Sequence, residues 1–345
     1  MLYIRTDMNQ DIATGHVMRC LSIADAAVSL GEKVTFILAD GQALELIRKR
    51  GHDAVILDTK WNEMESELKI LYKLIQERNI KSLLIDSYMV TSLYLFKLSQ
   101  WVNTAYMDDK NEFQYPVHTL ICYANYWQKF NYSQNYKGTR LLLGLQYVPL
   151  RKEFKGLKRK VIKKQLENIL LMSGGSDNHH ILAGFLYKLD VKKYKNIDVI
   201  CGRYCMDYEQ LCSRYHQDKN IHFHKAVENM EDYMLYADLA VSAGGTTLYE
   251  LCACGTPAIT YSVADNQLDN VLQFEKDGLM DYLGDVRSMD IFEKAAVLLE
   301  QYDKQQGIRQ SRSRRMQEIV DGNGAERIAE QLVWMNQNTF ESGVI

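Results

Sequence analysis

Short apolar runs alternate with longer amphipathic segments along the whole chain. The run at 2–5 precedes a helical apolar pattern at about 17–30, which ends at Gly31 in the position typical of a helix C-cap. In the first half, further strand-like runs lie at 33–38, 54–58, 82–88, 104–109, 118–123 and 140–144, with helical patterns at 44–49, 62–78 and 92–101. Apolar strands separated by helices are typical of a parallel sheet covered on both faces.

The pattern starts again after a basic, apolar-poor stretch at 151–165. A strand and its loop are predicted at 168–177, further strands at 197–202, 221–226, 239–245 and 258–263, and final helical segments at 290–320 and 325–336. A chain of 345 residues is longer than one ordinary domain. We therefore expect an α/β protein of two Rossmann-like, doubly wound domains facing a central cleft. Their predicted bounds are 1–150 and 166–345, the second including the terminal helices, with a linker at 151–165.

The composition indicates a soluble protein of a reducing compartment. Net charge is −3, so no overall field attracts nucleic acid or anionic lipid, and the basic runs at 155–164 and 309–315 lack interleaved aromatics. The chain has seven cysteines, an odd number, and no C-x-x-C motif. This argues against a disulfide framework and against a zinc site. Neither a signal peptide nor a membrane span is predicted. We expect a cytoplasmic protein without a metal or other cofactor and without membrane or nucleic-acid partners. The sequence does not set the oligomeric state, and a monomer is compatible with it.

The first candidate for chemistry is His16, on the loop between the first strand and the first helix. The segment T-G-H-V-M-R-C-L begins at Thr14, and Gly15 precedes the histidine. Open α/β sheets bind ligands at such loops, and a neutral imidazole is the usual general base near neutral pH. Arg5, Asp7 and Arg19 are close in sequence and join the candidate site. A histidine held by the backbone at a helix start is the alternative interpretation.

Two glycine-containing loops of the second half are candidate phosphate or sugar sites. S-G-G-S-D supplies Ser173, Gly174, Gly175 and Asp177, although Asp177 could instead cap the next helix. S-A-G-G-T-T-L-Y-E supplies Ser242, Gly244, Gly245, Thr246, Thr247 and Glu250. Each loop follows an apolar strand and opens a helix, an arrangement whose free N–H groups and helix dipole suit a phosphate. Glu250 could accept from ribose hydroxyls or act in a capping box.

Polar residues at other predicted strand ends complete the candidate site. Asp86 and Tyr88 end one first-half strand, Asp108 and its neighbour Asp109 end the next, and Asn266 and Gln267 follow the last strand of the second half. As surface loop residues they would be unremarkable. The chain contains no G-x-G-x-x-G, P-loop or G-x-S-x-G motif, which argues against dinucleotide, P-loop and serine-hydrolase chemistry.

Taken in order, these motifs resemble the UDP-sugar hydrolases of pseudaminic acid biosynthesis, which act on UDP-2,4-diacetamido-2,4,6-trideoxy-β-L-altropyranose. The resemblance covers R-T-D at 5–7, T-G-H-V-M-R-C-L at 14–21, the interdomain stretch at 141–154, the two glycine loops, G-T-P-A at 255–258 and D-N-Q at 265–267. The second-half motifs also occur in the wider GT-B superfamily, including the MurG-type N-acetylglucosaminyltransferases. M-D-D-K-N-E-F at 107–113 departs from the family, which often has more apolar residues there.

The resemblance implies a GT-B fold, with UDP held mainly by the second domain and hydrolysis at the anomeric carbon. His16 matches the family's catalytic histidine, residues 244–247 its phosphate loop, Glu250 its nucleoside contact, and Asn266 and Gln267 its sugar–phosphate contact. We therefore predict a hydrolase that releases UDP and a free sugar, with His16 activating water. Two alternatives remain at this point: a GT-B glycosyltransferase with a UDP-sugar donor, and a non-catalytic nucleotide-sugar-binding protein.

Overall fold

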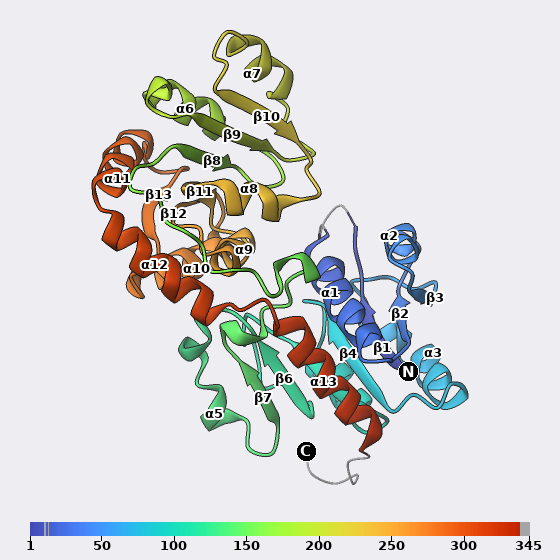
Figure 1. Cartoon of the computed structure of the whole chain (residues 1–345). Helices are drawn as coiled ribbons and strands as arrows, with labels where there is room; N and C mark the ends of the chain where they lie inside the picture. The colour runs from blue at the N-terminus through green and yellow to red at the C-terminus, as the bar shows by residue number, and fades with distance from the viewer. Residues whose placement is uncertain (10–11, 13, 339–345) are drawn as a thin grey trace. The chain divides into compact units, whose positions relative to one another are not determined.

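A computed structural model describes residues 1–9, 12 and 14–338. The chain divides into two compact units. Unit 1 comprises Met1–Lys152 together with the segment that begins at Gly322, and unit 2 comprises Glu153–Asp321. Each unit is a parallel β-sheet with helices packed on it (Figure 1).

Unit 1 contains a seven-stranded parallel sheet in the order β3-β2-β1-β4-β5-β6-β7. Its strands are β1 (Leu2–Thr6), β2 (Val34–Leu38), β3 (Asp53–Ile56), β4 (Ser82–Asp86), β5 (Asn103–Met107), β6 (Thr119–Cys122) and β7 (Arg140–Leu143). Its α-helices are α1 (Gly15–Ser29), α2 (Leu44–Lys49), α3 (Met64–Glu77), α4 (Ser92–Ser99), α5 (Tyr132–Asn135) and α13 (Gly324–Gln337). The order reverses between β1 and β4, which is the topological switch point of a doubly wound sheet.

The central strands of unit 1 carry the apolar side chains that the sequence pattern predicts. All five residues of β1, β2, β4 and β5 are buried, as expected for strands covered on both faces. One apolar core joins β4 to α3 and α4 through Leu71, Leu83 and Leu95. Helix and strand bounds agree with the expected ones to within a few residues.

The last helix, α13, belongs to unit 1, whereas the sequence analysis assigned it to the second domain. It packs against α1 and against the strands β1, β4 and β5 (red in Figure 1). The Asn103 amide donates to the backbone oxygen of Met335 at 2.9 Å. Gly324 starts the helix so close to the backbone of Val148 that a Cβ there would lie 2.2 Å from the Val148 oxygen. The chain thus returns to its first sheet after completing unit 2.

Unit 2 contains a six-stranded parallel sheet in the order β10-β9-β8-β11-β12-β13, with its switch point between β8 and β11. Its strands are β8 (Asn168–Met172), β9 (Asn196–Cys201), β10 (Ile221–Lys225), β11 (Leu239–Ala243), β12 (Ala258–Ser262) and β13 (Asp281–Asp285). Its α-helices are α6 (Ile181–Lys188), α7 (Tyr208–Arg214), α8 (Met230–Tyr236), α9 (Thr247–Cys254), α10 (Leu268–Lys276), α11 (Phe292–Lys304) and α12 (Gln306–Ile319). The predicted helical segment at 290–320 is therefore two helices, and the edge strand β13 was not expected.

The predicted linker at 151–165 is instead an ordered part of unit 2 from Glu153 onward. The Lys160 ammonium donates to the backbone oxygens of Met234 and Leu235, at 3.1 and 2.5 Å, and so caps the end of α8. Burial lowers the pKa of Lys160 to about 8. The basic character of this stretch therefore reflects solvent-facing side chains plus one partly buried helix cap. Within the described residues, none of the helices is both long enough and apolar enough to span a bilayer.

Candidate active site

In unit 1, His16 lies in the first turn of α1, beside the carboxyl end of β4. Thr14 is the N-cap residue of α1, without a side-chain cap bond, and both Thr14 and Gly15 are exposed. The His16 imidazole is 7% exposed, and its Nδ1 lies 2.6 Å from Oδ1 of Asp86, the last residue of β4. The pair therefore spans the switch point between β1 and β4, where ligands bind in open α/β sheets.

Arg19, one turn further along α1, binds the same carboxylate. Its Nε donates to Asp86 Oδ2 at 2.6 Å and its Nη2 donates to Asp86 Oδ1. Its Nη1 donates to the hydroxyl of Tyr123 at 2.8 Å. Tyr123 follows β6 and was not among the predicted site residues, because an isolated tyrosine after an apolar strand gives no signal in the sequence.

The charge of Asp86 is fixed by these neighbours. Burial alone would raise the pKa of the Asp86 carboxyl, but the charges and hydrogen bonds of Arg19 and His16 outweigh it and hold that pKa well below its usual range. Asp86 is thus a carboxylate, and Nδ1–H of His16 donates to it. Nε2 then carries the lone pair, and it has no hydrogen-bond partner among residues 1–9, 12 and 14–338. In the neutral form of the ring, this arrangement leaves Nε2 able to accept a proton.

Tyr88 and Asp109 extend the cluster on the other side of the imidazole. The Tyr88 ring packs edge-to-face against His16, with 4.6 Å between ring centroids. Its hydroxyl donates to Asp109 Oδ2 at 2.8 Å, and the Lys110 ammonium lies 4.2 Å from the ring centroid. Burial and the nearby Asp109 raise the pKa of Tyr88 well above its usual range, so it stays a hydroxyl.

The buried positions of Arg5 and Asp7 do not fit the predicted substrate contact. Arg5 is fully buried and forms a bidentate ion pair with Glu67, at 2.8 Å for both contacts, and its Nη1 donates to Asp7. Asp7 in turn accepts from the backbone N–H of Ala39. Arg5 thus binds two buried carboxylates, and its pair with Glu67 holds β1 to α3.

Asp108 likewise serves the loop after β5 and does not face His16. Its carboxylate accepts from the hydroxyls of Tyr115 and Tyr132 and from the backbone N–H groups of Lys110 and Asn111. The second aspartate of the pair, Asp109, is the one that reaches Tyr88 and lies 4.0 Å from Arg19. Of the two aspartates named from the sequence, Asp109 is therefore the one beside the His16 cluster.

In unit 2, the loop Gly244–Thr247 joins β11 to α9. The Gly244 N–H donates to the Tyr261 oxygen and the Gly245 N–H to the Ala243 oxygen. In the described chain, the N–H groups of Thr246 and Thr247 have no acceptor. The two threonines, at the positive end of α9, are therefore the available anion donors, and the glycines are not.

Gly244 and Gly245 differ in the space around them. A Cβ on Gly244 would lie 2.4 Å from Val271 Cγ1, whereas a Cβ on Gly245 would meet open space. Asn270, which the sequence analysis did not single out, holds this loop: its amide donates to the Gly244 oxygen at 3.0 Å, and its side-chain oxygen accepts from Tyr249. Ser242 is buried and donates to the Ala243 oxygen, so it faces the interior.

Three other predicted residues of unit 2 lie near this loop. Gln267 Oε1 accepts from the Val263 N–H at 3.0 Å, and the Gln267 Cβ is the second-nearest atom to a Cβ built on Gly244. Asn266 is exposed in the short 3₁₀ turn Asp265–Gln267. Glu250 is in the first turn of α9 and is partly exposed.

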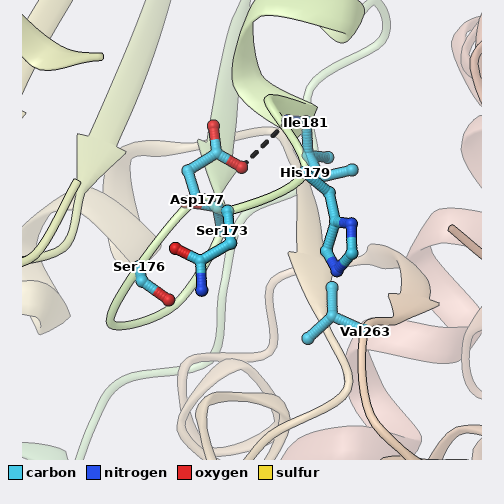
Figure 2. Close-up of a pocket in the computed structure, with 7 residues that line it drawn as sticks. Ser173, Ser176, Asp177, His179, Ile181 and Val263 are labelled. Atoms are coloured by element: carbon cyan, nitrogen blue, oxygen red, sulfur yellow. Dashed lines mark hydrogen bonds between the residues drawn. The ribbon is translucent and has the colours of Figure 1, made fainter. Parts of the chain in front are cut away.

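The loop Ser173–His179 after β8 borders a small pocket of about 100 Å³ (Figure 2). Asp177 accepts from the N–H groups of Ile181 and Leu182, at 2.9 and 3.0 Å, and thereby caps α6, as the alternative interpretation predicted. Ser173 Oγ is buried without a partner in the described structure. Gly174 has a positive φ of 85°. The backbone of Gly174 and Gly175 packs against Gly202, where a Cβ would lie 2.2 Å from the Gly174 oxygen.

The described part of the chain holds no group of three or more histidine, cysteine, aspartate or glutamate residues that could bind a metal ion.

Comparisons with known proteins agree with this architecture. Residues 169–332 match the model of the glycosyltransferase family 28 C-terminal domain. The chain is similar over 272 residues, at 24% identity, to the uncharacterized protein MJ1062 of Methanocaldococcus jannaschii, covering 74% of this chain and 54% of that protein. It is 31% identical over 187 residues to a Campylobacter jejuni UDP-N-acetylglucosamine--N-acetylmuramyl-(pentapeptide) pyrophosphoryl-undecaprenol N-acetylglucosamine transferase, covering 51% of each.

A third relative is a Helicobacter pylori pseudaminic acid cytidylyltransferase and UDP-2,4-diacetamido-2,4,6-trideoxy-beta-L-altropyranose hydrolase. It is 24% identical over 202 residues, which cover 57% of this chain and 37% of that protein. The chain thus spans about half the length, or less, of the curated relatives it matches. Among solved structures, Acinetobacter baumannii MurG matches with a TM-score of 0.70 at 12% identity, covering 97% of this chain and 100% of MurG. With its two doubly wound parallel-sheet units, the chain has the GT-B fold of glycosyltransferases such as MurG.

Proposed function

We propose that this protein is an enzyme that hydrolyses a UDP-activated amino sugar to UDP and the free sugar. The observation that carries the proposal is the His16–Asp86 pair, because it orients the imidazole with an available Nε2 at the switch point of the unit 1 sheet. The matches to UDP-sugar enzymes support a nucleotide-sugar substrate. We assign UDP to unit 2, with the Thr246 and Thr247 N–H groups as diphosphate donors.

In the proposed reaction, the oxygen of a water molecule bonds to the anomeric carbon while the bond from that carbon to the β-phosphate oxygen breaks. The bonding electron pair leaves with UDP, and one water proton passes to His16 Nε2. Asp86 stabilises the imidazolium that forms, in the manner of a carboxylate behind a catalytic histidine. Similarity to the Helicobacter pylori protein supports a diacetamido-trideoxy sugar as substrate.

A glycosyltransferase is the second candidate, and the 31% identity to the Campylobacter jejuni transferase favours it. In a transferase, His16 would deprotonate an acceptor hydroxyl, and UDP release would need that acceptor. The third possibility is a binding protein, which would bind UDP without turnover at high protein concentration.

One assay separates the three. UDP release is measured across a panel of UDP-amino sugars with no acceptor present, and the sugar product is identified by NMR. Free sugar supports the hydrolase, release only after an acceptor is added supports the transferase, and binding without release supports the binding protein. In ¹⁸O water, the hydrolase should label the sugar, and label in UDP would place the attack at phosphorus and refute the proposed mechanism.

A further inference from the structure

The sequence pattern predicted Arg19 to contact substrate, but its guanidinium faces the protein. The side chain is 13% exposed, and three of its N–H groups donate to Asp86 and Tyr123. We propose that Arg19 is a positioning residue for the proposed reaction, holding Asp86 as the carboxylate that orients His16 and keeping His16 neutral. This inference rests on the proposed function for its effect on rate, but its effect on His16 can be measured separately.

The geometry fixes Arg19 in this role from two sides. Its fork binds both oxygens of Asp86, which is the bidentate geometry that guanidinium groups form with carboxylates. On the other side, the hydroxyl of Tyr123 accepts from Nη1, and the Tyr123 ring lies 5.6 Å from the guanidinium carbon. Tyr123 is buried and its own pKa is raised to about 12 by burial, so it remains a neutral acceptor.

Arg19 also opposes protonation of the imidazole. Arg19 Nη2 lies 3.1 Å from His16 Nδ1. A protonated imidazole would therefore place its positive charge directly beside that of the guanidinium. Asp86 acts in the opposite direction, because a carboxylate favours the imidazolium. With Arg19 present, the effects of the two neighbouring charges on the imidazole oppose each other.

Without Arg19, the buried Asp86 carboxylate would have only His16 as a counter-charge. The pair would then take up a proton at higher pH, whether that proton sits on the ring or is shared with the carboxylate. The other titratable or charged groups around the cluster are the same in the wild type and in a variant without Arg19. They are Cys20 on α1, Tyr88 after β4, Asp109 and Lys110 after β5, and Tyr123 after β6.

The test compares Arg19→Met, which removes the charge, with Arg19→Lys, which keeps charge but loses the fork. Arg48→Met is the control, because Arg48 is exposed on α2. The His16 titration is followed by NMR of the imidazole Cε1–H signal, assigned with His16→Asn. We expect the His16 midpoint to rise by about one to two pH units in Arg19→Met, by less in Arg19→Lys, and not at all in the control.

The pH profile of kcat/KM gives the second measurement. In Arg19→Met its acid limb should move upward with the NMR midpoint, so that the defect is large at low pH and small at high pH. A lost substrate contact would instead raise KM by the same factor at every pH. Should Arg19→Met not fold, Tyr123→Phe keeps the ring and removes one anchor, and it should give a smaller shift in the same direction.

The outcomes are separable from those of the proposed function. An unchanged His16 midpoint in the folded Arg19 variants overturns the role of Arg19, whatever the activity. A shifted midpoint in a protein that releases no UDP from any UDP-amino sugar supports the charge assignment and refutes the hydrolase. A pH-independent rise in KM with an unshifted midpoint would return Arg19 to the substrate-contact role.

Discussion

The ion pair between Arg5 and Glu67 gives a prediction that separates a structural role from a substrate contact. Both side chains are fully buried, and Glu67 accepts two bonds of 2.8 Å from Arg5 and one of 2.7 Å from the Tyr94 hydroxyl. Glu67→Gln keeps the size but removes the charge, so the buried Arg5 cation would retain only Asp7 as counter-charge. Because Asp7 still compensates the Arg5 charge, the loss should be smaller than the about 3–5 kcal/mol of an unpaired buried charge. We expect unit 1 to lose about 1.5–3 kcal/mol, the usual contribution of a hydrogen bond to a charged group.

The assay uses the distribution of tryptophans. All four, Trp61, Trp101, Trp127 and Trp334, belong to unit 1, so their fluorescence during urea unfolding reports on that unit. The control is Glu77→Gln on the same helix, because Glu77 forms only an exposed i,i+4 pair with Lys73 at 3.6 Å. That control should cost less than about 0.5 kcal/mol. Equal stabilities of the two variants would refute the reasoning, and so would weakened UDP binding by a fully stable Glu67→Gln protein.

Three further changes test the site. His16→Asn should lower kcat by about 10²–10⁴-fold, the usual contribution of a positioned general base, and leave UDP affinity by calorimetry unchanged; activity within about threefold of wild type would remove His16 from the mechanism. Gly244→Ala should destabilise unit 2 by about 1–3 kcal/mol in thermal unfolding because its Cβ would overlap Val271, whereas Gly245→Ala should leave the melting temperature unchanged, and equal effects would contradict the packing argument. Burial raises the pKa of the Asp86 carboxyl, but Arg19 and His16 lower it by more, so the ionised carboxylate should stabilise unit 1 above about pH 4. The difference in unfolding free energy between wild type and Asp86→Asn should therefore shrink as the pH falls below about 4 toward the lowered pKa of the folded state. A difference that grows in this range would contradict the expected direction.

The alternation of apolar strands and amphipathic helices was enough to predict two doubly wound units, because covered parallel strands leave a strong local signal. The place of α13 was not predictable in this way. A helical pattern shows which face is apolar but not which sheet it covers, and α13 lies more than 200 residues beyond Asn103, which contacts its backbone. The break between α11 and α12 lacks a proline, and Gly307 at the start of α12 is a weaker breaker signal that the sequence analysis did not use.

Arg5 shows a second limit of the sequence. A charged residue inside a buried strand was interpreted as a ligand contact, since its compensating partner Glu67 lies 62 residues away on α3. Only the folded structure shows that the pair neutralises itself. The same holds in unit 2, where Asn270 supports the Gly244 loop from a helix that begins 24 residues later.

The contrast between Asp86 and Asp108 shows what topology adds to a strand-end rule. Both aspartates end or follow an apolar strand, and the sequence alone gave them equal weight. The sheet order places β4 directly beside β1, so the carboxylate that ends β4 meets the loop that follows β1, where His16 begins its helix. β5 is one strand further from the switch point, and Asp108 there turns into its own loop to bind Tyr115 and Tyr132. Asp109 reaches the cluster through Tyr88, which bridges the two strand ends, and it lies 4.0 Å from Arg19. Proximity to the switch point therefore decides which strand-end carboxylate can act on the imidazole.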